Sequence, residues 1–448
     1  MNTSMIVRLS LMMILCISLL SVAYADDYVI YVARKDSKAL EVAKTKSDNK
    51  SIYAERTFHK ALVKAADLLQ LGKHTVTVMV ANGEYVGKAK QGVWIVPKID
   101  NPEATLRLIG GFNDDFSERK PFDLLTALVT NEGRNGAFIQ FTKKSKLHEL
   151  VISGFLFDAA ASNKYDDETN SILKGQSRTY PLISLSLVML DHLVIDSNIF
   201  INGAHGAFDP YVTPTSNTMV DITNNFFLNT IKAIQIGAGL SFRGNTVKEI
   251  NLRNNSFILC WPFNPDATSS EVSAIKLYHK EGAEVLNIEN NLFAFNPGGV
   301  MQHDWPEDRM PDINLRNNLF YMNAGLFGDG EVDAGVLAGK FGTNPKYLIL
   351  NLETVEEDFS YTVEGNVAID PKVPVALVDL TASDSYSVHR KSTVLNDLRN
   401  LFGLNQRGGT VSISGFAPAM TFDVNNLPIP MEQNAKTYGV QINELWNP

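Results

Sequence analysis

Two short stretches of the sequence carry most of the side chains that could perform acid–base chemistry. The first contains Lys276, Tyr278 and His279, and the second contains His303 and Arg309. The lysine, the tyrosine and the histidines could each serve as a general base or acid. Lys276 or Arg309 could also neutralise a carboxylate, the arginine through a bidentate fork. A base, an acid and a cation are what is needed to remove a proton α to a sugar carboxylate, which begins β-elimination in a uronic-acid glycan.

Acidic, amide and aromatic side chains could complete such a site. Asp209, Asp304 and Asp329 could hold Ca²⁺, which prefers oxygen ligands. The same aspartates could instead supply the two carboxylates of an inverting glycoside hydrolase. Two tryptophans near the candidate residues could stack on sugar faces at the rim of a cleft. The candidate substrate-binding side chains are Tyr211, Gln235, Trp261 and Trp305.

A structural role is the alternative for each of these side chains. His279 begins the run His-Lys-Glu-Gly, which is also typical of a solvated turn. Asp308 and Arg309 could merely neutralise each other on a surface loop. Trp261 could pack beneath its own loop instead of facing a ligand. The chain contains no G-x-S-x-G elbow, P-loop or zinc-ligand spacing that would favour another chemistry.

The candidates can form one site only if a repeating scaffold brings them together. An eight-residue motif, apolar-x-apolar-x-(Asn or Ser)-Asn-x-Phe, occurs five times at spacings of 27, 30, 36 and 27 residues. Its first half alternates like a strand, its asparagine pair favours a turn, and its phenylalanine should point inward. A unit this short cannot bury its own apolar face, so successive units must stack. Equivalent asparagines should then form a hydrogen-bonded column: Asn198, Asn225, Asn255, Asn291 and Asn318.

A second strand follows each copy of the motif. About six residues after most of the motif phenylalanines, and after an extra loop at residues 261–273 in one copy, a small residue opens this strand, at Gly206, Ala233, Ala274, Gly299 and Gly325. Alignment on these openings places Phe208, Gln235, Lys276, Met301 and Phe327 at one equivalent position. Most of the other candidate residues fall within the next few positions. We therefore expect residues that are remote in the sequence to converge on one lateral surface.

These two patterns resemble the pectate-lyase-like superfamily of right-handed parallel β-helices over roughly residues 74–380. The asparagine pair resembles the short turn between the second and third sheets of that superfamily, and the Gly/Ala-opened strand resembles its first sheet. The resemblance implies an all-β, single-stranded right-handed parallel β-helix. It also implies that catalytic and calcium-binding groups lie on the first sheet and its flanking turns. The superfamily includes lyases, hydrolases, epimerases, esterases and non-catalytic proteins, so the reaction stays open.

The two ends of the chain are expected to differ from the repeat. Residues 1–25 have the charged, apolar and small-residue regions of a cleavable signal peptide, with Asp26 as the first mature residue. Residues 26–73 are predicted to form an N-terminal cap, and Thr75–Val80 the first strand. Residues 381–448 are predicted to form a C-terminal cap. The cap should contain an amphipathic helix with one apolar stripe: Phe58, Ala61, Leu62, Ala65, Leu68 and Leu69.

Composition narrows the classes of partner. The chain has 40 basic and 49 acidic side chains, and loss of the signal peptide changes the net charge from −9 to 39 − 49 = −10. This balance disfavours a nucleic acid but permits a local basic cleft for an acidic polysaccharide. Beyond the signal peptide no apolar stretch is long enough to span a membrane, and Cys260 is the single cysteine, so no internal disulfide forms. We expect a monomer, exported to the periplasm or beyond, that acts on an acidic polysaccharide by lyase or C5-epimerase chemistry. A glycoside hydrolase and a non-catalytic glycan-binding or surface-structural protein are the alternatives.

Overall fold

The computed structural model covers the chain with gaps. The predicted signal peptide and most of the predicted C-terminal cap lie outside the described residues. The described residues are 26–72, 74–87, 93–130, 137–164, 181–185, 187–204, 206, 208–209, 212–236, 247–260, 274–277, 283–294, 296, 300–303, 312–321, 323, 362–369, 371, 431–433 and 436–441.

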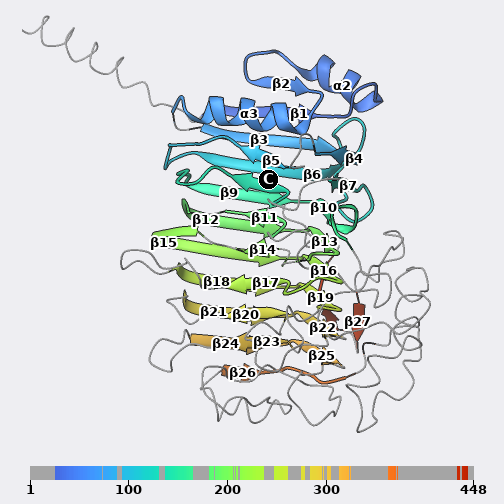
Figure 1. Ribbon diagram of the computed structural model, residues 1–448, viewed down its shortest axis with the longest axis vertical. Helices are drawn as coiled ribbons and strands as arrows, with labels where there is room; N and C mark the ends of the chain where they lie inside the picture. Colours follow the sequence, from blue (N-terminus) through green and yellow to red (C-terminus); the bar gives the residue numbers. More distant parts are fainter. Residues whose placement is uncertain are drawn as a thin grey trace, which may run out of the picture.

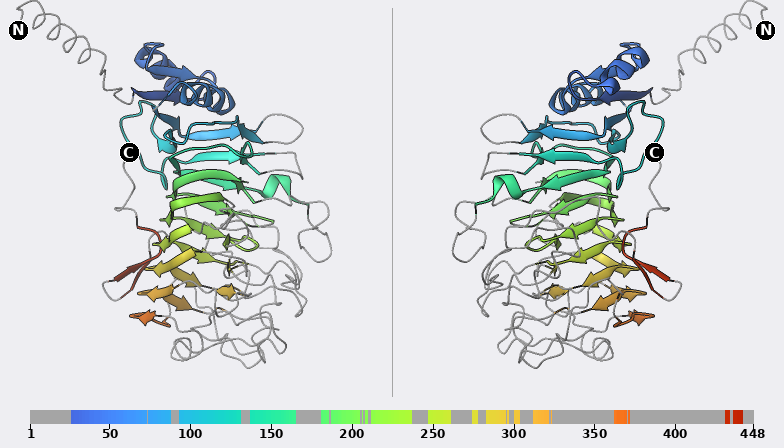
Figure 2. Two further views of the ribbon diagram at one scale, coloured as in Figure 1. Left: turned by 90° about the vertical axis from the view of Figure 1, so that its left-hand side faces the viewer. Right: turned by 90° about the vertical axis from the view of Figure 1, so that its right-hand side faces the viewer.

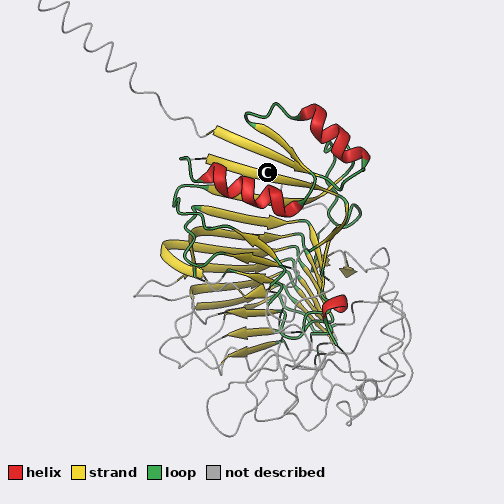
Figure 3. Cartoon of the chain, turned by 45° about the horizontal axis from the view of Figure 1, so that its top comes forward, coloured by secondary structure: helices red, strands yellow, loops and turns green. Residues whose placement is uncertain are grey.

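The described chain begins with β1 (Asp26–Val32), α2 (Lys38–Lys46), β2 (Ile52–Glu55), α3 (Phe58–Leu69) and β3 (His74–Ala81). Helix α3 buries the predicted apolar stripe and lies over the end of the stacked strands (Figures 1 and 3). Residues 75–80 form a strand as predicted, within β3, but they are not the first strand of the chain. β1 and β2 already extend the same sheet, because Ile30 and Val32 alternate inward like the apolar residues of β3.

The protein is mostly β, with three large sheets whose neighbouring strands all run parallel. We name them sheets A, B and C, with eleven, eight and seven strands respectively. From β3 onward the chain adds one strand to A, then one to B, then one to C, and each such pass is called a rung. Successive rungs lie one below the next from the N-terminal end, as Figures 1 and 2 show. Among the described residues, no helix is long and apolar enough to cross a membrane.

The strand bounds follow this cycle. Sheet A contains β1, β2, β3, β6 (Thr105–Phe112), β9 (Glu149–Ser153), β12 (Val188–Asp196), β15 (Val212–Thr223), β18 (Val247–Arg253), β21 (Ala283–Glu289), β24 (Asp312–Arg316) and β26 (Thr362–Glu364). Sheet B contains β4 (Gly83–Val86), β7 (Thr126–Val129), β10 (Phe155–Asp158), β13 (Ile199–Ile201), β16 (Phe226–Leu228), β19 (Ser256–Ile258), β22 (Leu292–Ala294) and β25 (Leu319–Tyr321). Sheet C contains β5 (Trp94–Val96), β8 (Ile139–Phe141), β11 (Ile183–Ser184), β14 (Phe208–Asp209), β17 (Ile234–Ile236), β20 (Ile275–Leu277) and β23 (Met301–His303).

The asparagine pair forms the turn between sheets A and B, as predicted. Its first asparagine takes a left-handed backbone, with φ between 53° and 56° in the four Asn-Asn copies. Its second asparagine is buried, and its side-chain oxygen accepts hydrogen bonds from the equivalent asparagine of the rung before. Asn225, for example, donates to Asn255 Oδ1 from its backbone N and from Nδ2, over 2.9 and 3.0 Å. The described column is Asn198, Asn225, Asn255, Asn291, Asn318 and Asn366.

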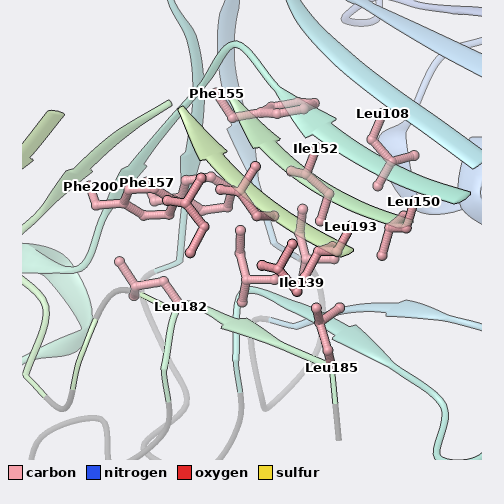
Figure 4. Close-up of a cluster of buried hydrophobic side chains, with 14 of the residues drawn as sticks. Leu108, Ile139, Leu150, Ile152, Phe155, Phe157, Leu182, Leu185, Leu193 and Phe200 are labelled. Carbon is pink, nitrogen blue, oxygen red and sulfur yellow. The ribbon is translucent and has the colours of Figure 1, made fainter. Parts of the chain in front are cut away.

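The motif phenylalanines form a continuous inward stack on sheet B, which confirms their predicted direction. Neighbouring ring centroids lie 4.8–5.3 Å apart, and the rings lie within 9° of parallel. Aliphatic side chains of sheets A and C complete the core, and Figure 4 shows Leu108, Ile139 and Phe157 converging from the three sheets. The stack contains Phe157, Phe200, Phe227, Phe257, Phe293 and Phe320.

Sheet A carries a ladder of charged side chains at one equivalent position of the motif. Glu289 lies between Arg253 and Arg316, with oxygen–nitrogen distances of 2.9 and 3.4 Å. These pairs are partly exposed, so each contributes less than about 1 kcal/mol to stability.

A C-terminal segment returns to the flank of the rungs. β27 (Met431–Gln433) and β28 (Lys436–Tyr438) form an antiparallel pair. The next three residues run across successive turns between sheets A and B: Gly439 N donates to Asn290 O over 2.8 Å, and Gln441 N to Asn224 Oδ1 over 3.0 Å. Val440 between them is fully buried.

Candidate functional site

The structure places three of the predicted site residues in one register column of sheet C. Gln235 of β17 pairs with Lys276 of β20, which pairs in turn with Gln302 of β23. Because Phe208 of β14 pairs with Ile234, Asp209 takes the position beside Gln235. Residues 209, 235 and 276 are remote in the sequence but occupy three consecutive strands, so their backbones lie side by side in sheet C.

The predicted alignment of these strands is wrong by one residue in two places. Phe208 and Met301 were aligned with Gln235 and Lys276, but they pair with Ile234 and Ile275. Met301 and Ile275 are buried, as the core side of the strand requires. The two misaligned strands open with glycine instead of alanine. In them the second residue after the glycine pairs with the first residue after the alanine of the neighbouring strand. A shift of one residue exchanges the two faces of a strand.

The column continues toward the N-terminal end of sheet C. Asp209 pairs with Ser184 of β11, which pairs with Gln140 of β8, and Gln140 pairs with Ile95 of β5. Gln140 and Ser184 are half-buried and Ile95 is exposed, whereas their strand neighbours are buried. This alternation places positions 95, 140 and 184 on the outer face of sheet C. We call positions 140, 184, 209, 235, 276 and 302 the polar column. Its first two members could not be predicted from the asparagine motif, because β8 and β11 follow strands that lack the full motif.

His303 does not share the column of Lys276. It pairs with Leu277, one position further along the strand, and lies two positions after the buried Met301. Lys276 and His303 therefore occupy positions of opposite parity in sheet C. The remaining candidates lie outside the described residues: Tyr211, Trp261, Tyr278, His279, Asp304, Trp305, Arg309 and Asp329.

Spacing within the polar column limits the chemistry that it supports. Neighbouring parallel strands lie about 4.8 Å apart, so Lys276 is one strand from each glutamine and about 10 Å from Asp209. Both register neighbours of the lysine are uncharged amides, which can hydrogen-bond to hydroxyl groups without neutralising a cation. An ammonium between two amides is a suitable recognition element for a sugar carboxylate.

Calcium binding at this site stays a prediction. Among the described residues, no three His, Cys, Asp or Glu side chains are grouped so as to hold a metal ion. Of the three predicted ligands, Asp209 alone has a described backbone position. Its register neighbours Ser184 and Gln235 each carry a side-chain oxygen, which is the donor type that Ca²⁺ prefers.

A second charged group lies on sheet A and is structural. His192 Nε2 is 2.7 Å from Asp221 Oδ2, and His192 Nδ1 is 3.3 Å from Glu149 Oε2. The hydrogen bonds to Asp221 and then to Glu149 raise the histidine pKa to about 9. Arg107 and Asn251 bind the outer sides of the two carboxylates. Every polar member thus has a partner inside the sheet, which is typical of a scaffold. Aligning the residues that precede the motif would have revealed Glu149 and His192 as neighbours.

A buried network at the turns that follow strands β6, β9, β12 and β15 of sheet A is also structural. Asp196 is 1 % exposed, and burial raises its pKa although Ser197 and Thr223 donate to its carboxylate. Arg119 approaches the same carboxylate through Ser153, whose hydroxyl donates to Asp196 over 3.0 Å. The partners surround Asp196 and leave no space for a substrate atom, so the network holds the turns together.

Cys260 lies in the core and is a free cysteine. Its thiol is fully buried beside Thr230, and burial raises its pKa to about 12, so it is not a nucleophile.

Comparison with known proteins identifies no relative: no family model, no curated protein and no solved structure matches this chain.

Proposed function

We propose that the chain is an exported right-handed parallel β-helix protein of the pectate-lyase-like type that acts on an acidic polysaccharide with the outer face of sheet C. The fold part of this proposal is supported by the regular cycle through three parallel sheets and by the asparagine ladder between A and B. A monomer is proposed because the chain's own helix α3 lies over the N-terminal end of the stacked strands.

One observation carries the functional part. Lys276 stands between Gln235 and Gln302 in the polar column, with Asp209 on the far side of Gln235. A glycan lying across the rungs would meet hydrogen-bonding groups about every 4.8 Å and a single cation at the position of Lys276. That pattern suits a chain whose sugars carry hydroxyl groups and carboxylates.

The proposed reaction is β-elimination or C5 epimerisation. Both begin with removal of the proton at C5 of a uronate, which needs its carboxylate neutralised and a base nearby. In this proposal Lys276 either neutralises the carboxylate or, as a neutral amine, takes the proton. In elimination the electron pair of the broken C–H bond forms the C4–C5 double bond, and the C4–O bond breaks with protonation of the leaving oxygen. In epimerisation a proton returns to the opposite face.

A non-catalytic glycan-binding protein is the second candidate. It is favoured by the two glutamines that flank Lys276, because amides recognise hydroxyl groups but do not transfer protons at neutral pH. A glycoside hydrolase needs two carboxylates across the scissile bond, and the polar column contains one, at Asp209.

The test is to incubate the purified mature chain with a panel of uronans, with calcium and with a chelator. A rise in ultraviolet absorbance from unsaturated products would support a lyase, and inversion at C5 seen by nuclear magnetic resonance would support an epimerase. Retention on an immobilised uronan without either change would support the binding protein. No product and no retention on any uronan would overturn the proposal of an acidic polysaccharide.

A further inference from the structure

A second site, separate from the polar column, is present at the N-terminal end of the molecule. A cavity of about 160 Å³ lies where the cap meets the first rung. Its wall is formed by the segment after β1, the start of α3, strand β4 and the first residue of β5. The side chains used below are Arg34, Arg56, His59, Glu84, Val86 and Trp94.

The charge of this cavity is positive. Arg34, Lys35 and Arg56 line it against a single carboxylate, Glu84, which leaves a formal charge of 3 − 1 = +2 with His59 neutral. Arg34 and Arg56 are exposed and form no ion pair within the described part of the chain. The guanidinium of Arg34 lies beside Gly83, where an added Cβ would come within 2.8 Å of Arg34 Nε.

The start of α3 adds to this positive field. The N–H groups of Phe58 and His59 precede the hydrogen-bond ladder of the helix, and Thr57 caps the helix by accepting a hydrogen bond from Lys60 N. The helix dipole places partial positive charge at the same end. Two independent features, the arginines and the helix end, therefore favour an anion in the cavity.

The rest of the wall is apolar. Trp94 and Phe58 are buried, with ring centroids 6.1 Å apart, and they form the floor. Val86 is 49 % exposed and stands at the rim. A ligand that carries an anionic group on a body with apolar C–H faces would match both halves of this wall. At about 160 Å³ the cavity is smaller than the roughly 300–1,000 Å³ that encloses a drug-sized ligand, so one sugar unit fits better than a chain.

We propose that this cap pocket binds the carboxylate of a terminal uronate residue, with Arg34 and Arg56 as the carboxylate ligands. The inference rests on the proposed function in its choice of a uronate, and it adds a binding site that the polar column does not contain. Because the pocket is built from the cap, β4 and β5, it would hold one end of an acidic glycan at the N-terminal end of the rungs.

The experiment measures binding by titration calorimetry to the full mature chain carrying Lys276→Ala, which removes the cation of the polar column. The probes are a trimer of galacturonate, the matching neutral galactose trimer and inorganic phosphate. Arg34→Gln/Arg56→Gln removes the two proposed ligands. Lys38→Gln/Lys60→Gln is the matched control, because it removes two charges from the same cap outside the pocket.

The expected result is that the pocket variant binds the galacturonate trimer at least about tenfold more weakly, since charge-assisted bonds to carboxylates are among the stronger ones. The control variant should bind it unchanged, and the neutral trimer should not bind. Equal galacturonate affinity in the pocket variant, or none in the parent, would overturn the inference. If phosphate bound as tightly as the galacturonate trimer, and if Arg34→Gln/Arg56→Gln abolished the binding of both, the ligand of the pocket would be a free oxyanion instead of a uronate. A last variant carries Arg34→Gln/Arg56→Gln but keeps Lys276. Formation of unsaturated product by this variant would show that the proposed function survives when the pocket inference fails.

Discussion

Asn291 Oδ1 accepts two hydrogen bonds from Asn255, one from the backbone N over 2.9 Å and one from Nδ2 over 3.1 Å. Asn255 in turn accepts the same pair from Asn225 and donates to Ile222 O. Each asparagine side chain thus hydrogen-bonds to backbone groups as well as to the equivalent asparagine of the next turn, so the column joins each turn to the turns on either side. All of these amides are buried, so no water can replace a missing partner.

Asn255→Ala should therefore destabilise the protein strongly. The change leaves the buried backbone N of Asn225 and the oxygen of Ile222 without their Asn255 partner, and it removes one of the two hydrogen bonds to Asn291 Oδ1, at a total cost of about 3 kcal/mol. Chemical denaturation of the mature chain measures the free energy of unfolding. Asn217→Ala is the matched control, because Asn217 is exposed and should change stability by less than about 0.5 kcal/mol. Equal stability of both variants would show that the ladder contributes little.

His192 predicts how stability depends on pH. Its pKa is raised from 6.5 to about 9 in the folded protein by hydrogen bonds to Asp221 and Glu149. Because the pKa of His192 is higher in the folded state than in the unfolded state, its protonated form stabilises the folded protein. This stabilisation is complete below about pH 6.5 and is lost as the pH rises through about 9. The free energy of unfolding should thus fall across this window.

The variant His192→Gln isolates this effect because glutamine does not titrate. It should be less stable than the parent at pH 6, and the difference should shrink toward pH 10. The exposed Asn217→Ala serves as the control and should keep the parental pH profile, because asparagine does not titrate. A constant difference between His192→Gln and the parent at all pH values would mean that the imidazolium does not stabilise sheet A.

Gly439 predicts how the C-terminal segment is held. Its φ is +73°, and a Cβ on it would overlap Ser256 Oγ, which accepts a hydrogen bond from Val440 N over 3.2 Å. Gly439→Ala should detach residues 439–441 from the turns, at a local cost of about 1–3 kcal/mol. Hydrogen exchange at Gly439 and Gln441 should become faster in the variant.

Gly203→Ala is the matched control for this change. A Cβ at Gly203 would make ordinary contacts at 3.5 Å, and its backbone is not left-handed. Protection of the C-terminal segment should be the same as in the parent. Unchanged exchange in Gly439→Ala would show that the segment does not depend on this close approach.

Much of the scaffold could be predicted from the sequence because one motif repeats. A unit such as Ile250–Phe257 is too short to bury its own apolar face, so the units must stack. Equivalent residues of stacked units then lie above one another, which predicts the asparagine column at Asn255 and the phenylalanine stack at Phe257. The Arg253–Glu289 pair was predictable for the same reason. The strand β1 was missed because it precedes the repeat and had no equivalent to be aligned with.

The candidate site was predicted less well, since it lies on strands of two or three residues. The backbone pairing of Gln235 with Lys276 was found, because both strands open with alanine at the same distance. The position of His303 was not predicted correctly, because its strand opens with glycine and begins one residue later after that glycine. A slip of one residue moves a side chain to the other face of the strand. The cap pocket was missed because Arg34 and Arg56 belong to different elements that meet only in the fold.

The measurement that tests the central claim most directly is uronan turnover by Lys276→Ala beside Lys248→Ala. Both lysines belong to the same rung, but Lys248 lies on sheet A and pairs with Glu284 over 2.7 Å. Lys276→Ala should lower the rate of product formation by at least about 100-fold with a nearly unchanged thermal midpoint, and Lys248→Ala should keep the parental rate. Turnover by Lys276→Ala at the parental rate, or a loss of activity that only follows a loss of folding, would contradict the account.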